Sequence, residues 1–284
     1  MSPELDELYV QARRVLLDGL EALGEQRRSV IVAGAQAIYL QAGPGGLPVA
    51  DTTSDGDLAV DPELLADEPT LAGLMEAKGF RLQELGGAPE PGIWESPAIV
   101  VNGAEVKIPV DLIVPIGAAP PGGSRGARLG SHGKRAARKA KGLEAALVDN
   151  QKRRVEALDP ADSREIEVRV AGPSALLVAK THKIADRVAS GREDRLDDKD
   201  DSDVLRLMQH FPPSQLAPVL KWLLRDPVAG EPTGQALAAF QELFGVAAGR
   251  GIAMASAALR IAMPADRVRA ISLAYAEDLA LRMA

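Results

Sequence analysis

The chain has 284 residues, of which 46% are hydrophobic and 26% charged, with a formal net charge of −7 at pH 7; such values are typical of a globular protein of one or two domains. The chain has no cysteine and only three histidines, which excludes disulfides, thiolate zinc sites and cysteine nucleophiles and argues against a histidine-rich metal site. No stretch approaches the roughly 18 apolar residues of a membrane span, and Met1 to Arg28 lacks a signal-peptide core, so we expect a cytoplasmic protein without membrane contact.

Hydrophobic periodicity and turn residues predict alternating helices and strands in the first part of the chain. Pro62 is expected at the first position of the helix that follows the paired aspartates, and Asn102-Gly103 at a hairpin turn. The expected elements are a helix over 4–25, a strand over 30–33, a helix over 34–40, a strand from Asp55 to Val60, a helix over 62–78, a strand over 80–85, a turn-rich loop over 86–91 and a hairpin over 98–114.

The pattern changes after the Pro- and Gly-rich stretch 118–123, which reads as a linker. We predict a basic helix over 134–150, a strand over 165–170, and mostly helix from Gly172 to Ala284 with breaks near Gly191, 211–213, 227–234 and Pro264. The sequence therefore predicts an α/β (α+β) N-terminal domain with a mixed sheet over 1–120. A mainly helical C-terminal domain is predicted over 121–284.

Asp55 and Asp57 are separated by one glycine at the start of an expected strand. Residues i and i+2 of a strand share a face, so the two carboxylates would lie side by side and repel. A divalent cation relieves that repulsion, because Mg²⁺ binds one or two carboxylates together with water and phosphate oxygens. The alternative is a solvated Asp-Gly turn, and these residues alone do not decide between the two.

Gly34 and Asp111 are two further candidates in this part of the chain. Gly34-Ala35 lies at a strand-to-helix junction, where free N–H groups form an anion cradle, although a glycine also simply closes a turn. Asp111 alternates with Val110 and Leu112, so it is expected on the opposite face of the strand from them. It lies among the apolar residues of 109–114, where a buried carboxylate needs a partner. That partner is a metal ion, or Asp111 pairs with Lys107 or caps a strand.

Three cations of the C-terminal part share one face of a predicted helix. Lys180, Lys183 and Arg187 are spaced i, i+3 and i+7, and Lys180 follows an apolar run, so it is expected to be partly buried. Asp200 and Asp203 either pair with Lys180 and orient it, or the residues 192–201 form a mixed-charge exposed loop. The face suits a triphosphate or a nucleic-acid backbone, and its alternative is a solvated face paired with local acids.

The segment from Arg125 to Arg154 holds ten lysines and arginines and two acids, a local charge of +8 that leaves −15 for the remainder. Such a segment suits a nucleic acid, an acidic partner or solvent alone. His132 within it is expected to touch phosphate or to be exposed, and Trp94 to stack on a base or pack on its own domain. The candidate nucleic-acid contacts are Arg125, Arg128, Lys134, Arg135, Arg138 and Lys139.

These motifs resemble those of the nucleotidyltransferase superfamily, in which a glycine turn is followed by Asp-x-Asp and a later carboxylate. The matching residues are Gly34-Ala35, Asp55-Gly56-Asp57 and Asp111. Residues 179–187 around Lys180, and Lys199-Asp200 with Asp203, resemble the lysine helix and acidic motif of AbiEii/MenT-type nucleotidyltransferase toxins. The resemblance covers roughly 29–210. It departs at Ala35, where a Gly or Ser is common, and at Asp51, where an arginine is common.

The resemblance implies a nucleotidyltransferase-like N-terminal domain. It also implies a Mg²⁺- or Mn²⁺-dependent enzyme that moves a nucleoside monophosphate from an NTP to a hydroxyl and releases pyrophosphate. Asp55, Asp57 and Asp111 would hold the metal, Asp111 would help deprotonate the hydroxyl, and Lys180 would neutralise developing charge. The nucleotide-binding residues would be Gly34, Ala35, Ser54, Lys180, Asp200 and Asp203.

The acceptor implied by the resemblance is a tRNA 3′ end, and the implied biological role is that of a toxin with a cognate antitoxin. Modification of Ser54 or Thr53, beside the metal site, by such an antitoxin is conceivable by analogy. Two alternatives stay open: transfer to a small molecule, as in antibiotic-modifying nucleotidyltransferases, and a non-catalytic nucleotide- or RNA-binding protein.

Overall fold

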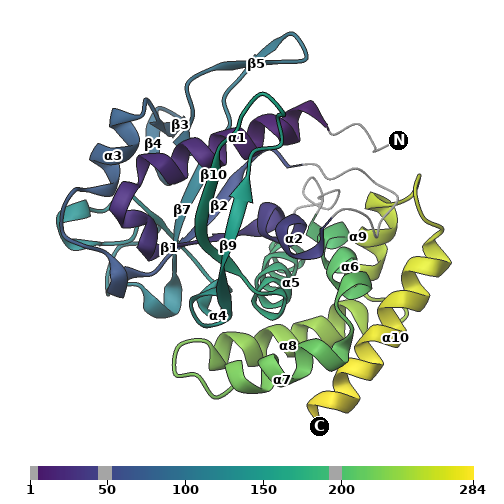
Figure 1. Cartoon of the computed structure of the whole chain (residues 1–284). Coiled ribbons are helices and arrows are strands. Elements are labelled where there is room, and N and C mark those ends of the chain that lie inside the picture. The colour runs from purple at the N-terminus through teal and green to yellow at the C-terminus, as the bar shows by residue number, and fades with distance from the viewer. Residues whose placement is uncertain (1–5, 44–52, 192–199) are drawn as a thin grey trace. The chain divides into compact units, whose positions relative to one another are not determined.

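A computed structural model describes residues 6–43, 53–191 and 200–284 and shows a mixed α/β chain with an eight-stranded mixed sheet (Figure 1). The chain forms two compact units. The first comprises the described residues of 1–37, 50–140 and 150–171, and the second those of 38–49, 141–149 and 172–284. Among the described helices, none is long and apolar enough to cross a membrane.

The first unit contains the sheet. Its helices and 3₁₀ turns are α1 (Glu7–Ala22), η1 (Gly24–Ser29), the start of α2 (Gly34–Ala42), η2 (Pro62–Leu64), α3 (Leu71–Ala77), η3 (Ile116–Ala118) and η4 (Gly130–His132). Its strands are β1 (Val30–Ala33), β2 (Gly56–Val60), β3 (Arg81–Leu85), β4 (Ala88–Glu95), β5 (Ile99–Val101), β6 (Ala104–Val106), β7 (Pro109–Pro115), β8 (Arg138–Ala140), β9 (Asn150–Glu156) and β10 (Glu165–Ala171).

The sheet has the order β3-β4-β7-β2-β1-β10-β9, and β8 pairs with the far end of β7. The pairs β1–β10, β2–β7 and β7–β8 are parallel, and the others are antiparallel. The centre of the sheet is β1, β2 and β7, whose apolar residues are buried. These three strands carry or adjoin the predicted glycine turn and the aspartates, so the site is built at the centre of the sheet.

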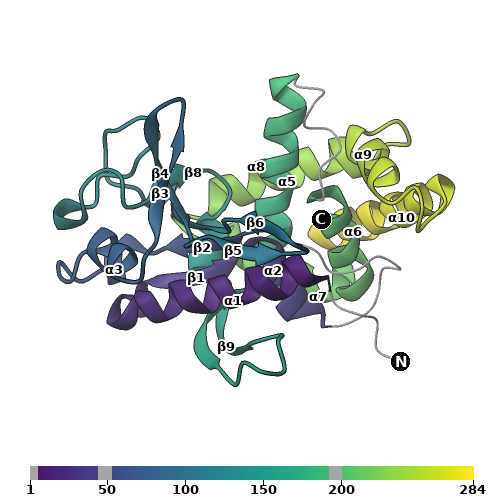
Figure 2. The same cartoon turned by 90° about the horizontal axis from the view of Figure 1, so that it is seen from above.

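Helix α1 lies across one face of the sheet (Figure 2). A Cβ on Gly56 would lie 3.2 Å from the Leu16 side chain, and a Cβ on Gly19 would lie 3.4 Å from Val110, so Gly56 and Val110 face α1. Side chains alternate along a strand. Asp57 and Asp111, the next residues, therefore face the opposite side of the sheet, which confirms the predicted orientation of Asp111.

Several predicted elements are found with altered boundaries. The predicted helix over 62–78 is a 3₁₀ turn followed by α3, because Pro69 lacks an N–H and disfavours helix at the residue before it. The predicted hairpin over 98–114 ends at β6; its turn is Asn102-Gly103 as predicted, and both residues have positive φ. Strand β7 then pairs within the main sheet.

The prediction missed three strands: β4, β9, and β8, which lies within the predicted basic helix. Strand β4 contains Pro89 and Pro91, and its first residues were predicted as a loop. Strand β9 is rich in charged residues and forms the edge of the sheet, where charged side chains are common. Trp94 lies on β4 and is fully buried, with its indole Nε1 donating to the Ala136 carbonyl at 2.9 Å. Trp94 therefore packs within its own unit, one of the two roles expected for it.

The predicted basic helix over 134–150 is not formed. Its residues make a loop, β8 and the short helix α4 (Glu144–Val148), because Gly133 and Gly142 adopt φ values of 77° and 94° that interrupt a helix. The division between units also differs from a boundary at residue 120. Residues 121–140 and 150–171 belong to the first unit because β8 pairs with β7 and β10 pairs with β1.

The second unit is helical, as predicted for the region after Gly172. It contains α4, α5 (Pro173–Ser190), α6 (Asp200–His210), α7 (Pro213–Leu223), α8 (Gly230–Phe244), α9 (Arg250–Ala258) and α10 (Ala265–Met283). Helix α5 begins where the Asp149 carboxylate accepts the Ala175 N–H at 2.9 Å. Helix α8 begins earlier than predicted, because Pro232 is tolerated in a first turn.

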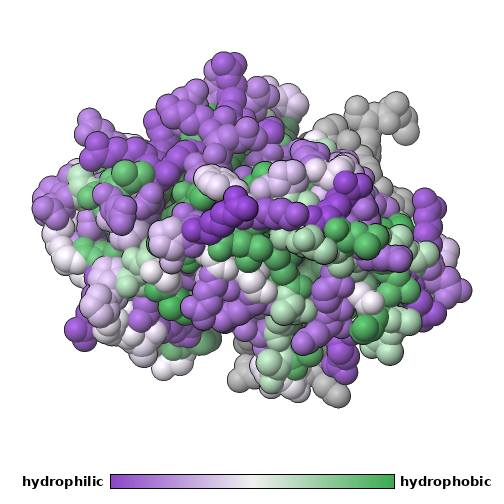
Figure 3. Space-filling model, turned by 90° about the horizontal axis from the view of Figure 1, so that it is seen from below, coloured by the Kyte–Doolittle hydropathy of each residue, from purple (hydrophilic) through white to green (hydrophobic). Residues whose placement is uncertain are grey.

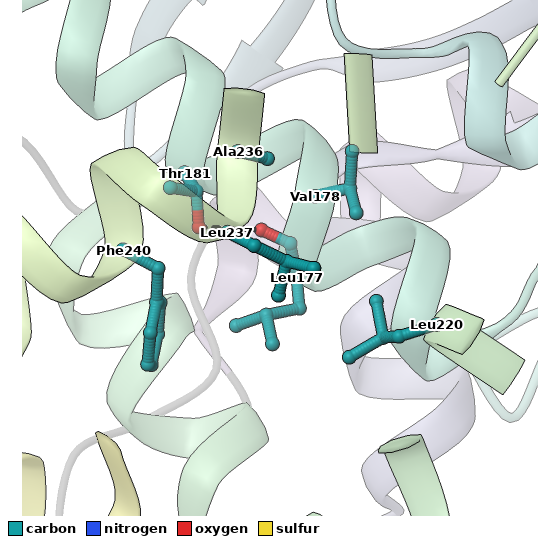
Figure 4. A pocket seen from close by; sticks show the side chains of 7 residues that line it. All are labelled: Leu177, Val178, Thr181, Leu220, Ala236, Leu237 and Phe240. Atoms are coloured by element: carbon teal, nitrogen blue, oxygen red, sulfur yellow. Dashed lines mark hydrogen bonds between the residues drawn. The ribbon is translucent and has the colours of Figure 1, made fainter. Parts of the chain in front are cut away.

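A small cavity of about 10 Å³ lies between α5, α7 and α8, lined by Leu177, Val178, Thr181, Leu220, Ala236, Leu237 and Phe240 (Figure 4). The Thr181 hydroxyl donates to the Leu177 carbonyl at 2.7 Å, so the only polar side chain of the lining is satisfied within α5. This volume is at the lower limit for one water molecule, and the lining is apolar. The cavity is a packing gap of the helical core rather than a ligand site.

Large hydrophobic side chains are also exposed on the second unit, at Trp222, Leu224, Val246, Ile261 and Leu281. The face of the molecule drawn in Figure 3 shows hydrophobic residues interspersed with hydrophilic ones. Isolated exposed apolar residues are ordinary on protein surfaces and indicate no function by themselves.

Candidate active site

The turn between β1 and α2 brings Gly34 against Asp57. Gly34 has a φ of 63°, and a Cβ built on it would lie 2.0 Å from Asp57 Oδ2. Both the backbone conformation and the space therefore require glycine. The register explains the approach, because Ala33 of β1 pairs with Asp57 of β2.

Asp57 and Asp111 lie directly opposite each other on the parallel strands β2 and β7. Neighbouring strands are about 4.8 Å apart and paired residues share a face. The two carboxylates therefore emerge side by side on the face opposite α1. Like charges in such a pair repel, so this arrangement requires positive charge nearby.

Asp55 precedes β2 rather than forming its first residue. Its carboxylate accepts the Thr53 hydroxyl at 2.7 Å, and its carbonyl accepts Gln36 Nε2 at 3.1 Å. Gln36 in turn accepts Arg13 Nε at 2.7 Å. Arg13 and Gln36 are buried and connect α1 and α2 to the Asp55 backbone; the sequence analysis missed both, and no spacing in the sequence signals the pair.

Asp111 has a cationic neighbour that was predicted for another role. Arg138 on β8 donates through Nε and Nη2 to Asp111 Oδ2, at 3.1 and 2.7 Å. Arg138 pairs in register with Ile113, which lies on the same face of β7 as Asp111. The predicted alternative partner, Lys107, instead pairs with Glu95 at 3.4 Å.

The fit of a divalent cation to this site rests on Asp57 and Asp111. Within residues 6–43, 53–191 and 200–284, no three His, Asp or Glu side chains are placed to hold a metal ion together. Mg²⁺ uses only one or two carboxylates and fills its shell with water and phosphate oxygens. The Asp57–Asp111 pair meets that requirement, and the absent side chain of Gly34 leaves room beside it. Participation of Asp55 stays a prediction.

The other predicted nucleotide-site residues of the first unit have simple placements. Ala35 lies in the first turn of α2, and Ser54 is exposed next to the buried Thr53. Asp51 and Lys199 lie outside the described residues.

The second unit holds a separate cluster around Lys180. Lys180 is 5% exposed and donates to Asp200 Oδ1 and, at 2.7 Å, to Asp203 Oδ2. Asp200 also pairs through Oδ2 with Lys183, at 3.1 Å, and with Arg187. The pairing of Lys180 with Asp200 and Asp203 is thus present. Arg206 lies on the same helix as these aspartates, and its guanidinium carbon is 5.0 Å from the centre of the Tyr39 ring.

Burial and charge pull in opposite directions in this cluster. Burial alone would lower the pKa of Lys180, but Asp200 and Asp203 outweigh it and raise that pKa well above its ordinary value. Burial likewise opposes ionisation of Asp200, but Lys180, Lys183 and Arg187 hold its pKa well below the ordinary range. Asp200 therefore stabilises the fold at neutral pH, and this contribution is lost only as the pH falls below about 4.

Asp203 behaves differently, because burial raises its pKa and the attraction of Lys180 only partly offsets this. Its neighbour Asp200 adds to the increase by repulsion. Lys180 is thus a buried cation that bonds to two carboxylates, one with a lowered pKa (Asp200) and one with a raised pKa (Asp203). These contacts establish a structural role for Lys180, while its catalytic role stays a prediction.

The six predicted nucleic-acid contacts divide into two groups. Arg125 pairs with Glu90 at 2.7 Å, Arg138 with Asp111, and Lys139 donates to the carbonyls of Gly122 and Gly123. Arg128, Lys134 and Arg135 are exposed and make no side-chain hydrogen bond or ion pair within the described part of the chain.

The loop that carries these three cations is firmly fixed. His132 is buried, accepts the Leu71 N–H at Nδ1 (3.0 Å) and contacts the Ala66 carbonyl through Nε2 (2.9 Å). His132 therefore anchors the loop. The prediction that it touches phosphate or is exposed to solvent is wrong. Arg128 and Lys134 line an open hollow of about 400 Å³ with the backbone of Gly130 and Gly133.

Comparison with known proteins identifies one distant structural relative. No protein-family model and no curated protein matches the chain. The structure of JHP933 from Helicobacter pylori is similar, with a TM-score of 0.45 and 14% sequence identity over 99% of this chain and 95% of that chain. A likeness this distant carries no inference about activity.

The contact between Gly34 and Asp57 generates a first prediction. Gly34→Ala should abolish Mn²⁺ binding, because the added Cβ must displace the Asp57 carboxylate. Gly24→Ala is the matched control, since Gly24 also has positive φ (52°) but has no atom within 4 Å of a built Cβ. Both should lose about 1–2 kcal/mol of stability from backbone strain, measured by thermal denaturation. Wild-type Mn²⁺ affinity in Gly34→Ala would contradict the assigned site.

The Lys180 cluster generates a second prediction. Lys180→Ala should destabilise the chain by about 3–5 kcal/mol, because it leaves two buried carboxylates without their shared cation. Lys183→Ala should cost less than about 1 kcal/mol, since the Lys183 side chain is 47% exposed and its pair is screened by solvent. Denaturant unfolding of the two variants measures the difference, and equal costs would refute the structural role of Lys180.

Proposed function

We propose that the protein is a divalent-metal-dependent nucleotidyltransferase that moves a nucleoside monophosphate from an NTP to an acceptor hydroxyl and releases pyrophosphate. The observation that carries this proposal is the convergence of Gly34, Asp57 and Asp111 at one edge of β1, β2 and β7. The order of the three along the chain is that of the nucleotidyltransferase motif, and the fold brings them side by side. The resemblance further assigns a nucleotidyltransferase-like fold to the first unit.

In this proposal each residue has a defined task. Asp57 and Asp111 would hold Mg²⁺ or Mn²⁺, and the ion would supply charge stabilisation for an in-line displacement. Asp111 also accepts the proton of the attacking hydroxyl. The backbone at Gly34 and Ala35 begins a helix and supports the terminal phosphates through its N–H groups. Thr53 and Gln36 fix Asp55, the third predicted ligand.

The cationic loop favours RNA over a small molecule as acceptor. Arg128, Lys134 and Arg135 project from a loop fixed by His132 and by the Trp94 bond to Ala136. Exposed cations on a fixed loop supply phosphate contacts at little cost in ordering. A small acceptor needs no such surface. By the family resemblance the acceptor is tRNA, and the protein acts as the toxin of a toxin–antitoxin system.

The activity is tested by incubating the protein with Mg²⁺, total tRNA and each α-labelled NTP in turn. Label should enter RNA with at least one NTP, and Asp57→Asn should reduce the rate by on the order of 1,000-fold because the transition-state charge loses its metal support. Asp61→Asn, four residues along the same segment, is the control and should retain activity. Intact Mn²⁺ binding without transfer from any NTP would favour a small acceptor or a non-catalytic binding protein.

The acceptor surface is tested separately by RNA binding. The double variant Arg128→Gln/Lys134→Gln should lower the slope of log Kd against log[salt] by about 1.5, since two phosphate contacts are lost. Lys152→Gln/Arg154→Gln removes the same charge from β9, where both cations pair with glutamates, and should leave the slope unchanged. Equal effects of the two variants would show that net charge alone, and not this loop, governs binding.

A further inference from the structure

Arg138 supplies positive charge directly beside the Asp111 carboxylate. Its guanidinium donates two N–H groups to a single oxygen, Oδ2, at 3.1 and 2.7 Å. The two side chains are partly exposed, at 24% for Arg138 and 14% for Asp111. The pair is therefore reachable from solvent, unlike the buried Lys180 cluster.

The backbone of Arg138 is held in place from three directions. It is paired in parallel with Ile113 of β7 and forms an antiparallel bridge with Gly126. Gly92 of β4 lies so close that a Cβ on it would be 2.3 Å from the Arg138 nitrogen. The strand cannot retreat easily, so the guanidinium can leave Asp111 only by rotation of its side chain.

We propose that Arg138 is a displaceable counter-ion that neutralises Asp111 beside Asp57 and competes with the divalent cation for the carboxylate. This inference rests on the proposed function, because it takes Asp57 and Asp111 as the metal ligands. It assigns Arg138 a positioning role at the metal site instead of the nucleic-acid contact predicted from the sequence.

Electrostatics fixes the direction of the effect. A cation coordinated by Oδ2 must displace the guanidinium, and one coordinated by Oδ1 lies within a few ångströms of a unit positive charge. In either case the guanidinium weakens cation binding. Removing it also takes positive charge away from two carboxylates that lie opposite each other, so a bound cation relieves more of their repulsion. Both effects make the cation bind more tightly when Arg138 is neutral.

A second partner is available to the displaced guanidinium in the proposed reaction. A planar guanidinium matches phosphate oxygens as well as carboxylate oxygens. Entry of a triphosphate would therefore lower the cost of releasing Asp111. Arg138 would thus disfavour the binding of bare metal and favour metal that arrives with the nucleotide.

Mn²⁺ titration followed by electron paramagnetic resonance of the free ion tests the inference without nucleotide or acceptor. Arg138→Gln should bind Mn²⁺ about tenfold more tightly than the wild type, and Arg138→Lys, which keeps the charge but loses the fork, should lie between them. Arg164→Gln is the matched control. Arg164 pairs with Asp162 at 2.6 Å in the same unit, at exposures of 27% and 16%, and its loss should leave Mn²⁺ affinity unchanged.

A double-mutant cycle with Asp111→Asn completes the test. The gain from Arg138→Gln should vanish in the Asp111→Asn background, because the competition is for that carboxylate. Equal or weaker Mn²⁺ binding by Arg138→Gln, or a gain that persists without the Asp111 charge, would overturn the inference. Circular dichroism confirms that each variant is folded before titration.

The outcome is separable from that of the proposed function. Tighter Mn²⁺ binding by Arg138→Gln with no transfer of label to any acceptor would support the counter-ion role of Arg138 and contradict the proposed enzymatic activity. Transfer of label with unchanged Mn²⁺ affinity in Arg138→Gln would support the proposed enzymatic activity and contradict the counter-ion role of Arg138. Absence of Mn²⁺ binding in both proteins would overturn the counter-ion and the metal ligands together.

Discussion

Asp57 and Asp111 stand opposite each other on neighbouring strands, and two carboxylates at a strand separation of about 4.8 Å repel. Much of the first unit follows from that pair. Apolar packing against α1 occupies the other face of β2 and β7, so the aspartates keep a side of their own. Glycine is required at position 34 because the Cβ of any other residue would overlap Asp57. Arg138 is brought in by a separate strand to supply positive charge.

The second unit solves the same problem in a different environment. Asp200 and Asp203 are buried, and a buried lysine bonds to both, so the charges are fixed and cannot be exchanged with solvent ions at modest cost. Asp57 and Asp111 are only partly buried. The comparison gives a physical reason to separate the two acidic pairs: burial makes one cluster structural, and partial exposure leaves the other able to take a different cation.

The sequence predicted the central features because they depend on local patterns. The strand–glycine–helix junction at Gly34, the Asn102-Gly103 turn, the orientation of Asp111 and the pairing of Lys180 with Asp200 and Asp203 follow from alternation, helical spacing and turn chemistry. The missed features depend on distant partners. Strand β4 holds two prolines, and β9 is a run of charged residues, so neither resembles a strand until its neighbour is known. The Arg13–Gln36 bond joins residues of two helices, which no periodicity reports.

The basic segment shows why charge in a sequence does not locate a binding surface. Three of its predicted nucleic-acid contacts have bonded partners. Arg125 pairs with Glu90, Arg138 pairs with Asp111, and Lys139 donates to the carbonyls of Gly122 and Gly123. Arg128, Lys134 and Arg135 are the same residue types in the same segment, yet they face solvent. The pairing of β8 with β7 places Arg138 against Asp111, whereas the loop anchored by His132 leaves Arg128, Lys134 and Arg135 exposed. Of the six predicted nucleic-acid contacts, three therefore remain exposed without a bonded partner among the described residues, and Arg138 contributes to the acidic site instead.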